Sequence, residues 1–446
     1  MTRLPMAGAV KSRLVPALGA AGAAALQREL TAHALAWARA AAGGAHALEV
    51  RFTGGTVEDM RRTFGPAFDY LPQGKGDLGA RMLAAFRSAA DSGIGRTLVI
   101  GSDCPGLDAD RLREAIGRLA THDVVLGPAH DGGYYLIGLR APESRLFDGL
   151  GWGGATVCRN TVERARGLGL EVALLEPLAD VDRPSDLRVW RRERRRRPPL
   201  PARARLSVIV PALDEAGRIG PLLDRLSRSQ AELIVADGGS RDATVRLAQA
   251  HGARVVASAP GRAQQMNAGA ASAEGDVLVF LHADTELPDR FENEVRAALA
   301  DPRVAGGAFR FALDAPGRRY RMLERLVGWR ARGLGLPYGD QALFVRADVF
   351  RGLGGFPEVE LLEDVALVWA IRRRGRLVIT RSAARTSGRL WREAGFARVT
   401  IANLLTVLAY FAGVSTARIA RARRRLLDRR VAGAASGAAT DGRCRP

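Results

Sequence analysis

Three stretches of this 446-residue chain decide its fold: LSVIVPALDE (206–215), ELIVADGGS (232–240) and DVLVFLHADT (276–285). In each stretch, a short apolar run is followed at once by acidic residues. Such runs are typical of strands that are buried on both faces of a parallel sheet, and ligands of these sheets bind beyond the carboxyl ends of the strands. The sequence therefore predicts an α/β fold with an acidic site at one edge of a sheet.

The same pattern occurs in the first half of the chain. The runs TLVI (97–100), DVVL (123–126) and YLIGL (135–139) are predicted strands, as is ARVVAS (253–258) in the second half. Helical stretches alternate with these runs, which indicates a mostly parallel sheet in each half.

An arginine- and proline-rich segment separates the two halves. In RRERRRRPPLPARARL (191–206), a charge run precedes three prolines in four residues. Proline ends a helix and favours an extended chain. We predict a first domain over residues 1–190, a linker over 191–205, and a second domain over 206–446 that ends in basic helices and a tail.

The net charge is +20, but two segments account for most of it. Residues 188–205 hold nine arginines and one glutamate, and residues 418–430 hold seven arginines and one aspartate, which together give +14. Each run is interpreted either as a solvated linker or helix face, or as a surface attracted to an anionic membrane. With 47% hydrophobic and 26% charged residues, the composition excludes a disordered, collagenous or coiled-coil protein.

The cysteines and the apolar segments bear on localisation. Cys104, Cys158 and Cys444 lie far apart, so neither a zinc ribbon nor a disulfide framework is expected. The sequence has no recognisable secretory signal, and we expect a cytoplasmic protein. The apolar stretch 399–414 is shorter than the ~20 residues that span a bilayer. It predicts either a packed helical hairpin or an interfacial helix that attaches the protein peripherally to the inner face of the cell membrane.

Three predicted strands in the second half end in carboxylates at the same edge: Asp214 with Glu215, then Asp237, then Asp284. A single aspartate after a strand is usually a turn or cap residue. Three in a row are better explained by a site for a cation and for hydroxyl groups, and carboxylate oxygens suit Mg²⁺ or Mn²⁺.

Six ordered motifs in the second half resemble the family 2 glycosyltransferases, and are most similar to the bacterial branch of arsenosugar-biosynthesis glycosyltransferases. The motifs are PALDEAGRI (211–219), VADGGSRDAT (235–244), GRAQQMNAGA (261–270), FLHADTELP (280–288), YGDQALFVR (338–346) and GGFPEVELLEDVAL (354–367). The resemblance covers nearly all of residues 206–420. It implies a GT-A fold, a nucleotide-sugar donor and a divalent metal, Mg²⁺ or Mn²⁺.

The resemblance also implies roles at the donor end of the site. Glu215 and Asp237 would hold the ribose and base of the donor, with Asp214 and Gly238 beside them. Asp284 would ligate the metal that bridges the two phosphates.

Three further residues belong to the same set of motifs. His282 replaces the first acid of the family's metal-binding motif, and a packing or hydrogen-bonding role is preferred to metal ligation. Arg262 would approach a phosphate, and Asn267 would bond sugar hydroxyls. The alternatives are a surface arginine and an ordinary helix amide.

An acidic pair, Glu363 with Asp364, opens a predicted helix and by the resemblance supplies the catalytic base, Asp364 first and Glu363 second. The alternative role is that of acids which stabilise a helix N-terminus. Asp340 and Gln341 are expected on the acceptor side. The late glutamine–arginine–tryptophan motif of the processive polymerases is replaced by GRLW (388–391), so we expect transfer of one sugar to a small or lipidic acceptor.

Motifs in the first half resemble a DUF2064-like nucleotide-diphospho-sugar transferase domain, and also small nucleotidyltransferases. They are GAVKSRL (8–14), QGKGDLGARMLAAF (73–86), VIGSDCPGL (99–107), VLGPAHDGGYYLIGL (125–139) and DVDRPSDL (180–187). That family begins with an apolar strand before the first of these motifs. Here MTRLPMAG (1–8) stands in its place, so either the start of the protein lies upstream of residue 1 or the domain lacks its first strand.

Five residues are candidates in this domain. Asp103 is the expected metal ligand and Asp182 a second one, Lys11 and Arg13 would contact phosphate, and Asp131 would lie beside the nucleotide. Turn, cap and surface roles are the alternatives.

The sequence therefore predicts two tandem GT-A-like domains, of which the second is a metal-dependent, inverting glycosyltransferase. One alternative is a nucleotidyltransferase that makes a nucleotide sugar through the first domain. A second alternative is a non-enzymatic basic protein that binds a membrane surface or nucleic acid. Acids at the strand ends repel phosphate, and no nucleic-acid partner is expected.

Overall fold

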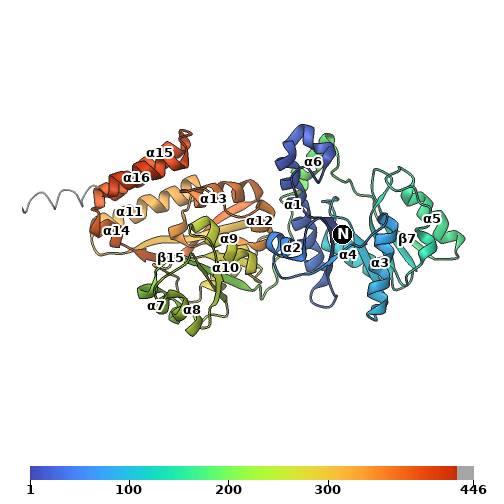
Figure 1. The fold of residues 1–446 in the computed structure, drawn as a ribbon, viewed down its shortest axis with the longest axis horizontal. Coiled ribbons are helices and arrows are strands. Elements are labelled where there is room, and N and C mark those ends of the chain that lie inside the picture. The colour runs from blue at the N-terminus through green and yellow to red at the C-terminus, as the bar shows by residue number, and fades with distance from the viewer. Residues whose placement is uncertain (429–446) are drawn as a thin grey trace, which may run out of the picture.

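The computed structural model describes residues 1–428. Two lobes lie side by side along the long axis (Figure 1). We call residues 1–193 the N-terminal lobe and residues 206–428 the C-terminal lobe. The helices α15 (Phe396–Phe411) and α16 (Thr416–Asp428) lie at the end of the C-terminal lobe that is far from the N-terminal lobe.

The C-terminal lobe is built on an eight-stranded sheet, with the order β10-β9-β8-β11-β14-β13-β15-β12 within the described residues. Its central strand β8 pairs in parallel with β9 on one side and with β11 on the other. β14 runs antiparallel to β11. The strands are β8 (Leu206–Ala212), β9 (Glu232–Asp237), β10 (Arg254–Ala257), β11 (Val277–Phe280), β12 (Thr285–Glu286), β13 (Val304–Asp314), β14 (Leu343–Arg346) and β15 (Arg376–Ser387).

The apolar runs are strands because both faces of this sheet are covered. Successive side chains of a strand point to opposite faces. Val208 and Val210 pack on one side with Leu222 of α7, and Ile209 packs on the other side with Met266 of α9. The prediction of an α/β fold with doubly buried strands is confirmed.

Helices form the two outer layers of this lobe. α7, α8 and α10 contribute to the core on one face, and α9, α12 and α13 to the core on the other. The helices are α7 (Ala216–Leu226), α8 (Thr244–Ala250), α9 (Arg262–Ser272), α10 (Phe291–Leu299), α11 (Arg318–Trp329), α12 (Ala347–Leu353), α13 (Glu363–Arg374) and α14 (Arg389–Glu393), followed by α15 and α16.

The apolar stretch near the C-terminus forms a helical hairpin, because α15 and α16 pack against each other. No helix among residues 1–428 is long and apolar enough to cross a bilayer. The end of the basic run, Arg429 and Arg430, lies outside the described residues, as does Cys444.

The N-terminal lobe contains two smaller sheets, one in the order β1-β2-β3 and one in the order β4-β6-β5-β7. The strands are β1 (Thr2–Arg3), β2 (Glu49–Thr53), β3 (Asp69–Pro72), β4 (Thr97–Ile100), β5 (Val124–Pro128), β6 (Tyr134–Leu139) and β7 (Val172–Leu174). The helices are α1 (Val15–Ala42), α2 (Val57–Phe64), α3 (Leu78–Asp91), α4 (Ala109–Arg118), α5 (Val157–Gly167) and α6 (Leu187–Glu193).

The mostly parallel arrangement holds for the first of these sheets and not for the second. β1, β2 and β3 are parallel, but β6 runs antiparallel to both β4 and β5. The reason is the short loop 129–133 between β5 and β6, since a connection of this length makes a hairpin and cannot cross over to a parallel strand.

A few residues of the arginine-rich segment predicted as an extended linker are buried at the junction of the lobes. α6 extends into it as far as Glu193, and Arg197 is only 7% exposed. Arg197 donates to the carbonyl of Arg374 (2.9 Å), and Arg346 donates to the carbonyl of Pro198 (2.7 Å). Arg197 and Pro198 therefore bind groups of the C-terminal lobe, whereas most of residues 191–205 are exposed.

Helix α1 of the N-terminal lobe contacts the C-terminal lobe at this junction. It packs against α12, and Glu29 on α1 forms an ion pair with Arg374 at the end of α13. The indole of Trp190 on α6 also donates to Glu29 (2.9 Å). Arg39 on α1 lies 3.0 Å from Asp276, just before β11.

A cavity lies between the two sheets of the N-terminal lobe and is lined by β2 of one and β4 of the other. β1 has two residues, which pair only with Phe52 and Thr53 at the end of β2. The amino group of Met1 donates to the carbonyl of Ile100 on β4 (2.5 Å), and burial lowers its pKa to about 6. Beside Met1 lies a cavity of about 590 Å³ lined by β2, β4, α1, α3 and α4.

This cavity predicts that an added strand stabilises the lobe. In the register of β1, residues joined before Met1 would run beside Val50 and Glu49 of β2. A chain extended there by Val-Leu-Val-Val should melt several degrees higher, because each buried apolar side chain contributes about 1.5–3 kcal/mol. The measurement is differential scanning calorimetry.

The matched control is an extension of the same length, Gly-Ser-Gly-Ser, which offers backbone groups but no apolar side chains. Equal melting temperatures for the two extended chains would contradict the account of the cavity as an open strand position.

Candidate active site

The loops that follow β8 and β9 are tied together by side-chain hydrogen bonds. The backbone N–H of Asp214 donates to Ser240 Oγ (2.9 Å), and the N–H of Arg241 donates to Asp214 Oδ1 (2.8 Å). The N–H of Glu215 donates to Thr244 Oγ1 (2.8 Å). The structure thus places Asp214 and Glu215 at the sheet edge beside the loop that follows Asp237.

Asp237 ends β9 and is buried, with 7% exposure. Its carboxylate accepts from the N–H groups of Gly239 (3.0 Å) and Ser240 (3.1 Å). A Cβ on Gly238 would lie 3.0 Å from Gln265 Nε2, so the glycine allows α9 to approach closely. Asp237 and Gly238 therefore shape the predicted donor end through a tight turn.

Gln265 on α9 was not singled out by the sequence, although it lies in one of the quoted motifs. Its buried amide donates to the carbonyls of Ala212 (2.7 Å) and Ala236 (2.9 Å), at the ends of β8 and β9. It fixes the helix that begins with Arg262 against the two strand ends.

A second group of acids gathers around the start of α13. Asp364 Oδ2 accepts from the N–H of Gly339 (2.6 Å), and Oδ1 accepts from the N–H of Val365 (2.8 Å). A Cβ on Gly339 would lie 3.1 Å from His282 Nε2 and 3.4 Å from Asp364 Oδ2. The structure therefore joins three predicted motifs, those of His282, Gly339 and Asp364, at one point.

Asp340 lies in this group with an unsatisfied oxygen. Its Oδ1 is buried and accepts no hydrogen bond from the described residues. Burial raises the pKa of Asp340 to about 6, against the lowering effect of Arg330, and the nearby charges of Asp364 and Asp284 raise the pKa as well. Arg262 is close enough to lower it.

Two neighbours have shifted pKa values for the same reason. Burial raises the pKa of Glu363, and the charge of Asp364 adds to this effect. Burial lowers the pKa of His282 to about 3, and Arg262 lowers it further. His282 is therefore neutral at pH 7, and its imidazole can accept as well as donate.

Two predicted contacts with the substrate are used inside the protein instead. Asn267, expected to bond sugar hydroxyls, donates to the carbonyl of Phe356 (2.9 Å) and accepts from its N–H (2.8 Å). Gln341, expected on the acceptor side, is fully buried and donates to the carbonyl of Phe309 (3.0 Å). Both side chains hold the loops that carry the acids.

Arg330 and Tyr338 were missed by the sequence reading. The guanidinium of Arg330 stacks over the Tyr338 ring, 3.4 Å from its centroid, and donates to the carbonyl of Leu336 (3.0 Å). No motif signals Arg330, since its role depends on the fold of residues 330–341.

The residues at this site fit a hard divalent cation that is shared with a diphosphate. Asp284 is exposed, and Asp340 has an unsatisfied oxygen. Among residues 1–428, no group of three or more histidine, cysteine or acidic side chains could hold a metal ion without other ligands. Mg²⁺ commonly binds through one or two carboxylates together with phosphate oxygens, which is the arrangement that these donors allow.

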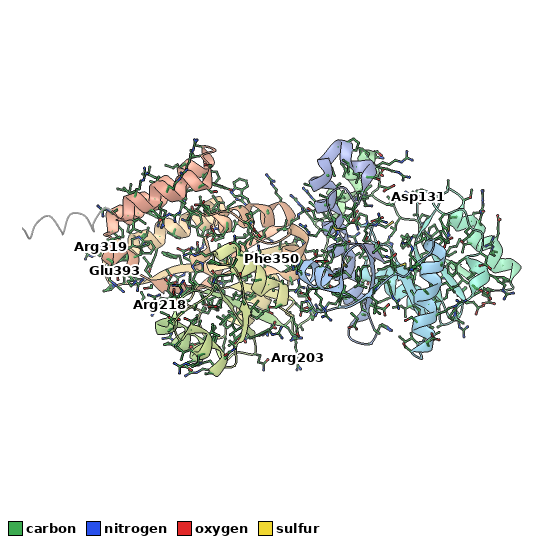
Figure 2. All side chains as sticks on the ribbon, viewed as in Figure 1. Asp131, Arg203, Arg218, Arg319, Phe350 and Glu393 are labelled. Carbon is green, nitrogen blue, oxygen red and sulfur yellow. The ribbon has the colours of Figure 1, made fainter. Side chains whose placement is uncertain are left out.

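The candidates of the N-terminal lobe lie in a separate site, since Asp131 belongs to one lobe and Arg218, which pairs with Glu215, to the other (Figure 2). Lys11 Nζ lies 3.0 Å from Asp103 Oδ1 and donates to the carbonyl of Val181 (2.7 Å). Lys11, expected to contact phosphate, is thus paired with the expected metal ligand.

The remaining candidates surround this pair. Arg13 forms an ion pair with Asp182, and Asp131 accepts from the N–H of Gly133 (2.9 Å). Burial raises the pKa of Asp180, and the charge of Asp131 adds to the shift. The structure therefore brings all five predicted residues of this lobe to one region.

Comparison with protein families assigns each lobe. Residues 207–352 match the family described as glycosyl transferase family 2, and residues 35–154 match the one described as "uncharacterized protein conserved in bacteria", DUF2064. The DUF2064 match therefore lies in the N-terminal lobe and the family 2 match in the C-terminal lobe. The family 2 match over the second lobe favours the glycosyl transferase hypothesis over a non-enzymatic basic binder.

A curated relative matches over a short part of its length. Over 96 residues the chain is 38% identical to glucosyl-3-phosphoglycerate synthase of Mycolicibacterium paratuberculosis. This match covers 19% of this chain and 29% of that protein. The chain therefore spans less than a third of the curated relatives that it matches.

Two solved structures are similar to one part of the chain each. A protein assigned as a nucleotide-diphospho-sugar transferase from Desulfovibrio desulfuricans G20 is 36% identical and covers 43% of this chain and 84% of that one, with a TM-score of 0.40. The second structure is glucosyl-3-phosphoglycerate synthase from Mycobacterium tuberculosis, solved with Mn²⁺, UDP and glucosyl-3-phosphoglycerate. It is 24% identical, and the match covers 46% of this chain and 80% of that chain, with a TM-score of 0.35.

The raised pKa of Asp340 predicts a pH-dependent stability of the glycosyl transferase domain. The folded state holds the proton up to a pKa of about 6, whereas the unfolded chain loses it near about 3.9, so stability falls as pH rises between these values. Asp340→Asn should therefore raise the free energy of unfolding by about 1–3 kcal/mol at pH 7.5 and by little near pH 4.

The measurement is urea unfolding at the two pH values, with chelator present and nucleotide absent. The matched control is Asp289→Asn, a change of an exposed aspartate that should alter stability equally at both pH values. If Asp340→Asn raised the free energy of unfolding equally at both pH values, the Asp340 carboxyl would not be the source of the pH dependence.

Proposed function

We propose that the glycosyl transferase domain transfers a sugar from a nucleotide-sugar donor to an acceptor hydroxyl, with inversion at the anomeric carbon. The observation that carries the proposal is that Asp284, Asp364 and Arg262 all lie close enough to Asp340 for their charges to act on it. The identity to glucosyl-3-phosphoglycerate synthase over 96 residues supports the same class of reaction.

The donor nucleotide binds in this proposal at the edge formed by Asp214, Glu215 and Asp237. These acids offer carboxylate oxygens to the ribose hydroxyls and to base N–H groups, and their loops are already ordered by mutual hydrogen bonds. Arg262, at the first turn of α9, is the cation available to a phosphate oxygen.

The diphosphate then lies beside Asp284, whose exposed carboxylate would hold Mg²⁺ or Mn²⁺ together with the phosphates. When bound, the metal would neutralise the charge that develops on the leaving nucleoside diphosphate. Asp340, with its unsatisfied oxygen, is the second carboxylate within this group.

Asp364 is proposed as the general base. Each of its oxygens accepts one backbone hydrogen bond, which leaves a lone pair on each for the acceptor proton. The acceptor oxygen bonds to the anomeric carbon while the bond from that carbon to the phosphate oxygen breaks. The proton moves to Asp364, and the nucleoside diphosphate leaves with the electron pair.

The acceptor in this proposal is a small molecule or a lipid that receives one sugar. The motif resemblance to the arsenosugar-biosynthesis branch suggests that the acceptor belongs to an arsenosugar-type pathway. The name of the curated relative, glucosyl-3-phosphoglycerate synthase, suggests a small phosphorylated acid as an alternative acceptor. A screen of acceptors with a fixed donor separates these classes.

The DUF2064 domain supports a second candidate function, the synthesis of a nucleotide conjugate. Lys11, Arg13, Asp103, Asp131 and Asp182 lie in one region of this lobe. The signature of that activity would be release of pyrophosphate from a nucleoside triphosphate, lost in Asp103→Ala.

The role of Asp364 predicts a selective loss of turnover. Asp364→Asn should lower kcat about 10²–10⁴-fold and leave the Kd of the donor nearly unchanged, because the base acts on the acceptor proton alone. The measurements are steady-state transfer and calorimetric donor binding, with the anomeric configuration of the product determined by NMR.

The neighbouring acid provides the matched control. Glu363→Gln changes a buried carboxyl on the same turn and should reduce kcat far less. Full activity of Asp364→Asn together with loss of activity in Asp340→Asn would transfer the base role to Asp340, and retention of configuration would contradict a single displacement.

A further inference from the structure

Helix α15 exposes its larger apolar side chains and buries its smaller ones. Val399, Ala402 and Thr406 face inward and are at most 7% exposed. The outward residues are spaced three or four apart, and each is 50–58% exposed. We call them the apolar stripe: Ile401, Leu404, Leu405, Leu408 and Phe411. A helix of a globular protein normally buries such a face, so this one is arranged for a partner.

The helix packed against α15 is strongly basic on its outer side. In α16, Ile419 and Ala420 are buried, whereas four of the arginines around them are exposed. Those arginines are Arg418, Arg421, Arg424 and Arg425. Asp428 is the sole acid in α15 and α16.

The apolar stripe continues onto the helix of the candidate base. The ring of Phe411 meets the edge of Trp369 on α13, with ring centroids 6.2 Å apart, and Trp369 is 40% exposed. α13 begins with Glu363 and Asp364, so Trp369 lies about 7.5 Å further along the helix axis from Asp364.

We propose that the apolar stripe and the α16 arginines dock on the surface of an anionic lipid bilayer, with α15 in the plane of the interface. A helix with an apolar face and a basic flank is the arrangement that buries hydrocarbon among acyl chains and pairs cations with anionic headgroups. Since no helix of residues 1–428 is long and apolar enough to span, the contact is peripheral.

Charge favours a bilayer over a second copy of the chain. In a twofold dimer through the apolar stripe, the same surface would meet itself, and the α16 arginines of one copy would lie near those of the other. A bilayer that contains anionic lipid supplies the opposite charge along the whole helix.

The proposal does not rest on the transferase activity, because docking requires neither donor nor acceptor. If the proposed transfer also holds, docking brings α13, and with it Asp364, close to a lipid surface. A lipid-linked hydroxyl then becomes the favoured acceptor class.

The experiment is vesicle flotation of the full chain without nucleotide. Vesicles of phosphatidylcholine alone are compared with vesicles of phosphatidylcholine and phosphatidylglycerol in equal parts. The chain should bind the mixed vesicles, and binding should weaken about tenfold or more in Leu404→Ser with Leu408→Ser, and also in Arg421→Gln with Arg424→Gln and Arg425→Gln.

The matched control changes exposed leucines elsewhere, Leu71→Ser with Leu174→Ser in the N-terminal lobe, which should bind as the unchanged chain does. Circular dichroism confirms that each variant is folded. No binding to either vesicle, or equal binding by the stripe variant, overturns the proposal. Sedimentation velocity measures the oligomeric state. A dimer of the unchanged chain that becomes a monomer in the stripe variant would also overturn the proposal.

Discussion

The parallel pairing of β8 with β9 and β11 is the constraint on which the candidate site depends. Its register sets Ala212 opposite Asp237 and Ile209 opposite Phe280, so the chain leaves the sheet at the same edge three times. At that edge the amide of Gln265 donates to the carbonyl of Ala212 on β8 and to the carbonyl of Ala236 on β9, which ties α9 to both strands. The acids are therefore held by loops whose two ends are fixed.

Much of this arrangement could be predicted because it follows from short-range pattern. Apolar runs specify doubly buried strands, and polar residues placed directly after them must lie at the sheet edge. The residues that order the site could not be found in this way. Gln265 and Gln341 look like ordinary polar residues, and the role of Arg330 requires the ring of Tyr338 and the carbonyl of Leu336 in one place.

The two basic segments show what composition alone cannot decide. A run of arginines has the same sequence pattern whether it is solvated or paired, and only the fold brings carbonyl groups to Arg197. The apolar segment at 399–414 shows the converse. Its hydrophobicity indicated packing, but the hairpin buries Ala402 and Thr406 and exposes Leu404 and Leu408.

The account makes the glycosyl transferase domain the place where the donor and the metal meet. The most direct measurement is thermal unfolding with UDP-, GDP-, dTDP- and ADP-sugars, with and without Mn²⁺, for the unchanged chain, Asp284→Ala and Asp103→Ala. One donor at about 100-fold its Kd should stabilise the protein by ~2.7 kcal/mol in the presence of metal. The account predicts that this shift is lost in Asp284→Ala and kept in Asp103→Ala; a shift lost only in Asp103→Ala would contradict it and make the DUF2064 domain the working site.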